Sequence, residues 1–389
     1  MIDASAYPMS GVKVVELAHV ASGPFTGLLF ADMGADVVKV EPPKGETFRN
    51  WPPFVGVGED RMSTQFAALN RNKKSISADL KNPADVEMVR KLCREADIVL
   101  ENFRPGVAER LGLGYEALAK DHRGLIYCSI SGFGQTGPYR DKGAFDIIIQ
   151  AMSGAMSVTG ERGGSPVKCG LPIGDFVSGL YAAFAIAALL PEARAGKSAF
   201  VDVPMLDCLI AISPLRTSEY FGTGKIPGLM GNEHPTNVPY QSFASADGHF
   251  VVAAGTDKLF RHICDVVEQP QWATDPRFYD QDHRVQYREL LTDMFQAEFV
   301  KRPKAEWLER FEAASIPCGS INNFEEILAD PHVTEGGLLM DVEIPGGSVP
   351  TASFPCRISG LPPLYRNGPP LVDADREAIL RDWGVALEA

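Results

Sequence analysis

Short β-branched runs alternate with helix-like stretches from residue 12 to about residue 130. Parallel strands joined by helices give this pattern, so it predicts an α/β fold with a doubly wound sheet. Ligands of such sheets bind at the carboxyl ends of the strands. The runs with strand character are residues 12–17, 36–41, 75–80, 97–102 and 125–130, and residues 83–96 have helical spacing.

A long apolar stretch follows at residues 179–190, which contain no charged side chain. It is shorter than the ~18 uninterrupted apolar residues of a membrane span, so it predicts a buried helix and no membrane partner. The first residues lack a basic segment followed by an apolar one, and we expect no secretory leader.

The character of the chain changes after residue 205. Gly and Pro punctuate residues 206–239, which predict a linker between a first domain, residues 1–205, and a small α+β domain, residues 240–316. The small domain has a hairpin signal at Asp247–Gly248 and helical patterns at 257–268, 283–300 and 303–316. Residues 317–389 offer a strand, a short helix, a hairpin at 345–347 and a helix at 373–384. The pattern leaves open where this last segment packs.

Composition narrows the class of partner. The 389 residues carry a net charge of −13, which provides no global positive field for nucleic acid or an anionic membrane and predicts small-molecule partners. The seven cysteines are scattered and have no C-x-x-C or metal-ligand spacing. We therefore expect a cytoplasmic protein without a metal site.

Familiar phosphate and nucleophile motifs do not fit. Gly196–Lys197–Ser198 has the end of a P-loop, but Pro191 occupies the position of the required first glycine. The first strand is followed by AHVASGPF rather than G-x-G-x-x-G, although Ser22 is placed to begin a helix whose amides face a ligand. The chain has no G-x-S-x-G elbow, which argues against a serine hydrolase. Cys128, within an apolar strand, is interpreted as a buried, inert thiol.

Basic residues gather near the predicted sheet edge in an otherwise acidic chain. This concentration suggests a polyphosphate ligand, and an ion-paired surface is the alternative. The residues are Lys44, Arg49, Arg71, Lys73, Lys74, Arg104 and Arg110.

Asp175 lies between a glycine and the long apolar stretch, which contains no charged side chain. It precedes the predicted helix, so an N-cap role is the simpler interpretation. The apolar surroundings also suit a carboxylate that acts as a nucleophile toward an acyl group. With an ordinary pKa of about 3.9 it would be ionised at neutral pH and need no general base.

These residues belong to longer stretches that resemble the class III CoA-transferases, the CaiB/BaiF family that includes formyl-CoA transferase and carnitine CoA-transferase. The resemblance covers nearly the whole chain and is carried by residues 14–43, 69–81, 97–118, 127–138 and 173–190. It implies that Asp175 is the catalytic residue. It implies CoA-binding positions at His19, Ala21, Ser22, Ala78, Leu80, Asn102, Phe103, Arg104, Arg110, Lys142 and Phe145.

The same resemblance implies that coenzyme A and acyl-CoA are substrates, that small carboxylic acids are the other partners, and that no cofactor is permanently bound. The reaction would pass through aspartyl–acyl anhydrides and an aspartyl-CoA thioester. The implied architecture is a Rossmann-like large domain completed by residues 317–389, a smaller α+β domain, and an interlocked homodimer.

Departures from family patterns refine the prediction. The racemases of the family carry a histidine base where this chain has Phe145, which cannot take a proton. The linker lacks a run of glycines, which argues against formate and oxalate. Residues 51–56, 238–243 and 316–324 look most like the branch that uses succinyl-CoA with dicarboxylates. The alternatives are an acyl-CoA racemase or isomerase, and a CoA-binding protein without turnover.

Overall fold

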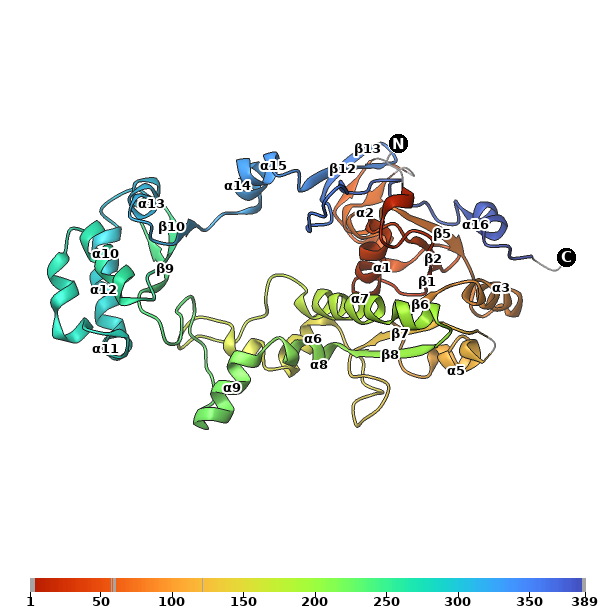
Figure 1. Cartoon of the computed structure of the whole chain (residues 1–389), viewed down its shortest axis with the longest axis horizontal. Coiled ribbons are helices and arrows are strands. Elements are labelled where there is room, and N and C mark those ends of the chain that lie inside the picture. Colours follow the sequence, from red (N-terminus) through yellow and green to blue (C-terminus); the bar gives the residue numbers. More distant parts are fainter. Residues whose placement is uncertain (1–3, 57, 59–60, 121, 387–389) are drawn as a thin grey trace. The chain divides into compact units, whose positions relative to one another are not determined.

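The computed structural model describes residues 4–56, 58, 61–120 and 122–386 (Figure 1). The chain divides into two compact units. The large unit contains Met1–Ala155, Lys168–Gly224 and His332–Ala389, and the small unit contains Met156–Val167 and Lys225–Pro331.

A parallel sheet of six strands organises the large unit. Its strand order, β5-β2-β1-β6-β7-β8, is the order of a Rossmann fold, so the predicted doubly wound α/β fold is confirmed. The strands are β1 (Lys13–Glu16), β2 (Asp36–Glu41), β5 (Lys73–Ser77), β6 (Ile98–Glu101), β7 (Ile126–Ser131) and β8 (Ala199–Pro204). The pattern predicted all of them except β8, an edge strand whose residues are mostly half-buried or exposed and so lack a continuous apolar run.

Helices cover both faces of this sheet because successive strand residues point to opposite sides. Val14 and Val37 pack with α1 (Ser22–Asp32), α7 (Ile173–Arg194) and α8 (Met205–Ala211). Val15 and Val38 pack with α3 (Pro83–Arg94), α5 (Tyr115–Ala119) and α16 (Arg376–Asp382). Cys128 is fully buried, as predicted, and burial raises the pKa of its thiol.

Helix α7 is buried on one side only, so the prediction of a buried helix is half right. Gly174, Ser178, Ala182, Ile186 and Leu190 form the buried stripe at four-residue spacing, whereas Leu180, Tyr181 and Phe184 are exposed. The helix is also long and apolar enough to cross a membrane, a property that it shares with helices packed on a sheet.

The C-terminal segment completes the large unit at the β5 edge of the sheet. Asp375 Oδ2 accepts from the Ser75 N–H at 2.9 Å, and Asp373 Oδ1 accepts from the Ser77 N–H at 2.7 Å. The Asn72 N–H donates to the Asn367 carbonyl at 2.9 Å. The remaining elements of this unit are β3 (Phe54–Val55), β4 (Met62–Ser63), α2 (Thr64–Asn70), α4 (Val107–Arg110), α6 (Asp146–Met152), α9 (Pro214–Thr223), α15 (Pro331–Glu335) and the predicted hairpin of β12 (Leu339–Ile344) and β13 (Gly347–Ala352).

The small unit has its own antiparallel sheet and an aromatic core. Its strands lie in the order β11-β10-β9, and β9 and β10 form the hairpin predicted around Asp247–Gly248. Phe243, Phe250, Phe299 and Trp307 pack together in its core. Its elements are β9 (Tyr240–Ala244), β10 (His249–Ala253), α10 (Asp257–Val266), α11 (Gln281–Gln286), α12 (Arg288–Phe299), α13 (Lys304–Ala313), β11 (Cys318–Ser320) and α14 (Phe324–Ala329).

Candidate active site

The turns that follow β1 and β6 meet where the winding of the sheet reverses. The two strands are neighbours, and the chain leaves them in opposite directions, which opens a crevice at their carboxyl ends. The His19 N–H donates to Asn102 Oδ1 at 2.9 Å, and Asn102 Nδ2 donates to the His19 carbonyl at 2.8 Å. These paired hydrogen bonds join the two turns into one wall.

A cavity of about 260 Å³ lies against this wall. Asp175, from the first turn of α7, lines it together with most of the predicted CoA-binding residues. Those residues are His19, Ala21, Ser22, Asn102, Phe103, Arg104, Lys142 and Phe145.

A second cavity of about 370 Å³ shares His19 and Phe103 with the first. It is lined by two further predicted residues, Ala78 and Leu80. Arg110 is not among the described residues that line either cavity and is exposed at the end of α4. The structure thus brings the predicted residues into two adjoining cavities, with Arg110 outside them.

Helix α7 begins at Ile173, so Asp175 is the third residue of the helix and not its N-cap. The helix lies close to α1 because Gly179 has no side chain: a Cβ there would lie 2.9 Å from Phe25 Cδ1 and 3.0 Å from the Ser22 carbonyl oxygen. The rings of Phe25 and Phe176 meet edge to face with centroids 4.9 Å apart. This packing fixes Asp175 beside the turn that precedes α1.

A second carboxylate, Asp146, stands at the start of α6 and also lines the cavity. Its Oδ1 accepts from the Gly174 N–H at 2.8 Å, and its Oδ2 accepts from Gln150 Nε2 at 2.6 Å. Gln150 Oε1 accepts in turn from the Cys169 N–H at 2.8 Å. Asp146 therefore anchors the residue next to Asp175 and is itself held by a buried amide.

Burial and the neighbouring Asp146 carboxylate raise the pKa of Asp175 to about 7. The expectation of an ordinary pKa, with full ionisation at neutral pH, was wrong. It failed because a half-buried carboxylate loses hydration and because a like charge lies nearby. His19 is shifted in the other direction: burial and the Lys39 ammonium lower its pKa, so its ring is neutral at neutral pH.

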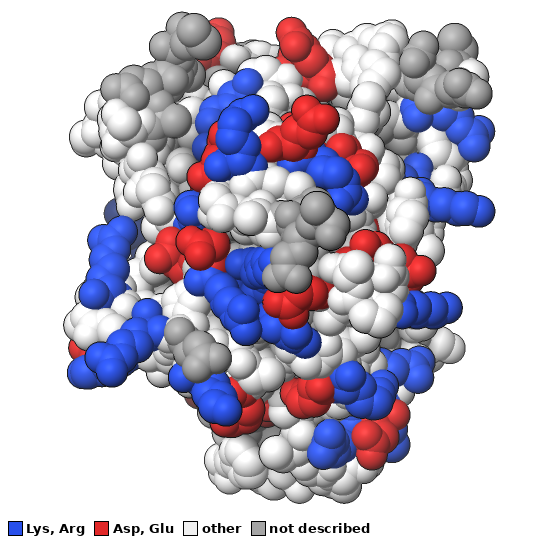
Figure 2. Space-filling view, turned by 90° about the vertical axis from the view of Figure 1, so that its right-hand side faces the viewer, with Lys and Arg blue, Asp and Glu red and all other residues white. Residues whose placement is uncertain are grey.

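Most of the basic residues that suggested a polyphosphate ligand are ion-paired within the fold. Arg71 pairs with Asp32, Lys73 with Glu16, and Arg49 with Glu41, all with buried carboxylates. Lys74 pairs with Asp36 nearer the surface. The ion-paired alternative was therefore right for these four, except that two of the cations are buried. Figure 2 shows Lys and Arg interspersed with Asp and Glu on one face of the protein.

The cations that do line the first cavity are Arg104, Arg140 and Lys142. Arg104 Nη2 lies close to Gly143: a Cβ added at Gly143 would lie 3.2 Å from this nitrogen. Lys142 Nζ lies 3.6 Å from the centre of the Tyr139 ring. The sequence interpretation missed Arg140 and the role of Asp146, although both lie in the same loop region as Phe145.

Phe145 is 77 % exposed and precedes α6 as its N-cap residue. An aromatic ring at this position adds apolar surface beside Asp175 and offers no group that takes a proton. Within the described part of the chain, no group of three His, Cys, Asp or Glu side chains is arranged to hold a metal ion.

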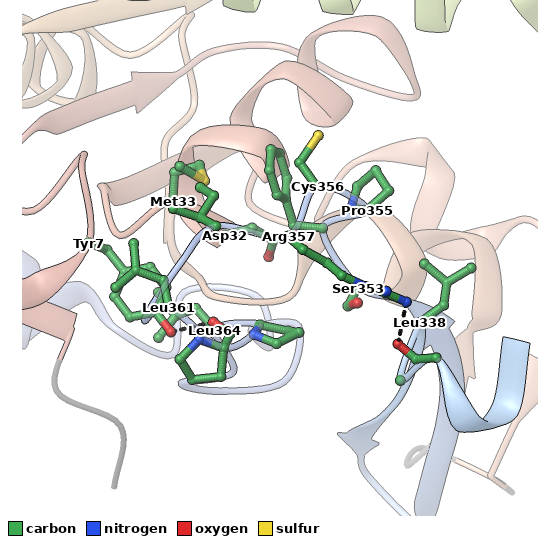
Figure 3. Close-up of a pocket in the computed structure, with 16 residues that line it drawn as sticks. Tyr7, Asp32, Met33, Leu338, Ser353, Pro355, Cys356, Arg357, Leu361 and Leu364 are labelled. Atoms are coloured by element: carbon green, nitrogen blue, oxygen red, sulfur yellow. Dashed lines mark hydrogen bonds between the residues drawn. The ribbon is translucent and has the colours of Figure 1, made fainter. Parts of the chain in front are cut away.

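A separate cavity of about 330 Å³ lies between the C-terminal segment and the end of α1 (Figure 3). Tyr7 donates to the Pro362 carbonyl at 2.5 Å, and Arg357 donates to the Gly336 carbonyl at 3.1 Å. Asp32 reaches its wall but is fully engaged with Arg71 and Asn72. This cavity contains none of the predicted site residues.

The Rossmann strand order, with a carboxylate in a cavity where the winding of the sheet reverses, defines an α/β protein with a candidate ligand site at the carboxyl ends of its strands. Comparison with known proteins supplies the family. The model of CoA-transferase family III matches residues 9–376, and the chain belongs to this family. The resemblance inferred from the sequence is confirmed, and the protein is a family III CoA-transferase.

Individual relatives cover nearly the whole chain. A succinate–glutarate CoA-transferase of Agrobacterium fabrum is 40 % identical over 381 residues, which are 96 % of this chain and 95 % of that protein. An acetyl-CoA:oxalate CoA-transferase of Acetobacter aceti is 38 % identical, with 97 % and 96 % covered. The crystal structure of a CaiB/BaiF family protein from Brucella suis matches with a TM-score of 0.88 and 36 % identity over 97 % of this chain and 99 % of that one.

Proposed function

We propose that the protein transfers CoA from an acyl-CoA, with succinyl-CoA as the first donor to test, to a dicarboxylic acid, and that Asp175 is the nucleophile. The observation that carries the proposal is the position of Asp175 in a cavity lined by the predicted CoA-binding residues. The raised pKa supports it, because a carboxylate that is poorly solvated is more nucleophilic than one in water.

In the proposed reaction an Asp175 carboxylate oxygen attacks the donor thioester carbonyl, the C–S bond breaks, and CoA thiolate leaves an aspartyl–acyl anhydride. The thiolate then attacks the aspartyl carbonyl of this anhydride, which releases the donor acid and forms an aspartyl-CoA thioester. The acceptor carboxylate attacks that thioester and expels the thiolate, and the thiolate finally takes the acceptor acyl group from the second anhydride. Asp175 is regenerated as a carboxylate, and no net proton is consumed.

Water would hydrolyse both kinds of intermediate, so the site has to exclude it. Phe103, Phe145 and Met205 give the cavity apolar wall on several sides of Asp175. The N–H groups of Ser22 and Gly23 have no acceptor within α1, because they begin the helix. We propose that they stabilise the oxyanions of the tetrahedral intermediates, since the Gly174 N–H already donates to Asp146.

Two observations favour a dicarboxylic acid as the acceptor: the charge of the cavity lining and the names of the relatives. The cavity is lined by three cations, Arg104, Arg140 and Lys142, and by two carboxylates. This excess of one positive charge suits a ligand with more than one anionic group. The Agrobacterium and Acetobacter relatives are named for glutarate and oxalate, both dicarboxylic acids. Oxalate, which the linker sequence argued against, therefore belongs in the substrate screen beside glutarate.

We also propose that the protein is a homodimer. The large unit has exposed apolar surface on α7, α8 and α9, and surface of this kind marks interaction sites. Its exposed members include Leu180, Phe184, Ile210, Leu215 and Phe221. The family resemblance implies a second copy of the chain as the partner.

The central test traps the intermediate. The protein is incubated with succinyl-CoA and hydroxylamine, and peptide mass spectrometry locates the hydroxamate. We expect it on Asp175, and we expect Asp175→Ala and Asp175→Asn to lose both the label and the transfer of CoA to glutarate. Label on another residue, or full transfer by either variant, would disprove the proposed nucleophile.

A control separates transfer from the racemase alternative. The protein is incubated in deuterated water with a 2-methylacyl-CoA and no acid acceptor. A transferase leaves the α-hydrogen in place, whereas a racemase exchanges it.

A further inference from the structure

Four buried ionisable side chains form a closed network beneath the turn between β1 and α1. Lys39 Nζ lies 2.9 Å from Glu16 Oε1 and 2.6 Å from Glu46 Oε1, and Lys73 Nζ lies 2.8 Å from Glu16 Oε2. The four side chains are at most 1 % exposed. With two ammonium groups and two carboxylates, the network is neutral overall.

The network also binds the backbone of the turn at three points. Lys39 donates to the Ala18 carbonyl at 2.9 Å, and Lys73 donates to the Pro24 carbonyl at 2.8 Å. Between them, Glu46 Oε2 accepts from the Val20 N–H at 2.7 Å. The turn from residue 18 to residue 24 is thus held at both ends and in the middle by side chains that water does not reach.

Val20 has a backbone conformation that its side chain disfavours. Its φ is +67°, in the left-handed region, where a β-branched residue is strained. Such a conformation persists only where the surroundings impose it. The hydrogen bond from Val20 to Glu46 is the contact placed to impose it, and Val20 lines the cavity that contains Asp175.

Stability alone is a poor reason for this arrangement. Buried ion pairs lose hydration on folding, and apolar side chains of similar volume often stabilise a protein as well or better. Three of its four side chains, Lys39, Lys73 and Glu46, instead hydrogen-bond the turn. This turn carries three of the predicted CoA-binding residues, His19, Ala21 and Ser22.

We propose that Glu46 is a positioning residue for the transfer reaction. By accepting the Val20 N–H, it holds the turn in its strained form, and Lys39 holds Glu46 in place. The turn then presents its wall to the CoA thioester at the correct distance from Asp175, where displacements of about 1 Å cost large factors in rate. This inference rests on the proposed function, since Asp175 is taken as the nucleophile.

The test uses glycine, which adopts a positive φ without strain. We compare the effect of Glu46→Ala in the native chain with its effect in a Val20→Gly background, measuring kcat and KM for CoA transfer and Kd for free CoA. In the native chain we expect kcat to fall about tenfold or more as the strained turn relaxes. In the Val20→Gly background, the factor by which Glu46→Ala lowers kcat should be several-fold smaller, because little strain remains for Glu46 to oppose.

Two further variants separate positioning from folding. Glu46→Gln keeps an oxygen for the Val20 N–H, so it should retain more activity than Glu46→Ala. Asp32→Asn breaks another buried ion pair of the large unit, to Arg71, outside the cavity, and should lower the melting temperature while kcat stays near that of the native protein. If Glu46→Ala does not fold, Glu46→Leu, which also lacks an acceptor for the Val20 N–H but fills the space of the side chain, is compared in the two backgrounds instead.

The proposal is overturned if the loss caused by the Glu46 substitution is the same in both backgrounds, or if Asp32→Asn lowers kcat as much. Failure of the proposed function gives a different result: native protein that binds CoA but transfers none. In that case the comparison of Kd values across the two backgrounds still decides whether Glu46 positions the turn.

Discussion

The most informative residue is Asp175, because its environment changes how it can react. With a pKa raised to about 7, a large fraction of the side chain is protonated at neutral pH, and only the ionised fraction is a nucleophile. Nearby Asp146 contributes to this shift while it also anchors the start of α7. Asp146 therefore helps to fix the position of Asp175 and also raises its pKa.

A pH profile follows from this shift. Since the proposed nucleophile is the carboxylate form of Asp175, kcat/KM should rise as pH increases through about 7 and level off above it. Initial rates of CoA transfer from pH 5.5 to 9 would measure this rise, the acid limb of the pH profile. A flat profile over that range would contradict the raised pKa.

Substitution of Asp146 should move the limb. Asp146→Asn removes the like charge but keeps an oxygen for the Gly174 N–H, so the pKa of Asp175 should fall and the acid limb should shift to lower pH. The measurement is the midpoint of the limb for the variant beside that of the native protein. Asp207→Asn, at a carboxylate outside the cavity wall, is the control and should leave the midpoint unchanged.

The raised pKa of Asp175 also predicts that ionisation of this side chain destabilises the folded protein at higher pH. A carboxyl group whose folded pKa is raised stabilises the fold below its unfolded pKa, near 4, and that contribution is lost as pH rises through about 7. Asp175→Asn cannot ionise, so it should melt at a higher temperature than the native protein at pH 8 but not at pH 4.5. Thermal unfolding at the two pH values checks this, and an equal difference at both would count against it.

The sequence predicted Asp175 as a candidate but not its pKa. An apolar run beside a single aspartate is visible in the chain, whereas the approach of Asp146 depends on how α6 packs on α7. Similarly, Arg110 belongs to the family pattern but lies outside both cavities, because side-chain direction on the short helix α4 is set by tertiary structure.

At the scale of elements, strands and helices were largely predictable because most are amphipathic or wholly buried. One exception is β8, which lies at an edge and has no continuous apolar run. Two others are the helices α8 and α9, which occupy much of residues 206–223, where the Gly and Pro pattern predicted a linker. The buried network was also missed. Its signal was present, since Glu16 and Lys39 each directly follow a pair of valines in β1 and β2, where an unpaired buried charge would be costly.

Helix α1 packs on this network through a glycine. A Cβ at Gly27 would lie 2.0 Å from Glu16 Oε2, which has no room to move. Gly27→Ala should therefore destabilise the protein by about 1–3 kcal/mol or more, as overpacked cores do, and urea unfolding would measure the loss. Gly222→Ala is the matched helical control: its Cβ meets nothing within 4 Å, so stability should be unchanged or slightly higher.

For the whole molecule, pattern alone indicated two folded units joined by a linker, and the expectation of a homodimer came from the family resemblance. The structure adds that apolar side chains are exposed on α7, α8 and α9, where Phe184 is 74 % exposed. An isolated chain with such a surface would be prone to association.

A charge within this exposed apolar surface tests the proposed dimer. Phe184→Asp should shift the protein from dimer to monomer in light scattering coupled to size exclusion, because the carboxylate would be buried without a partner. Phe184→Leu keeps the apolar surface and should remain dimeric. A native protein that elutes as a monomer would refute the proposed assembly.

The closure of the β5 edge by Asn367, Asp373 and Asp375 has a consequence for biosynthesis. A nascent polypeptide displays bare amide donors on that outer strand until residues 367–375 have been synthesised, and such an edge readily recruits foreign strands. Premature termination just ahead of residue 367 should accordingly yield insoluble aggregates instead of a shortened but active catalyst.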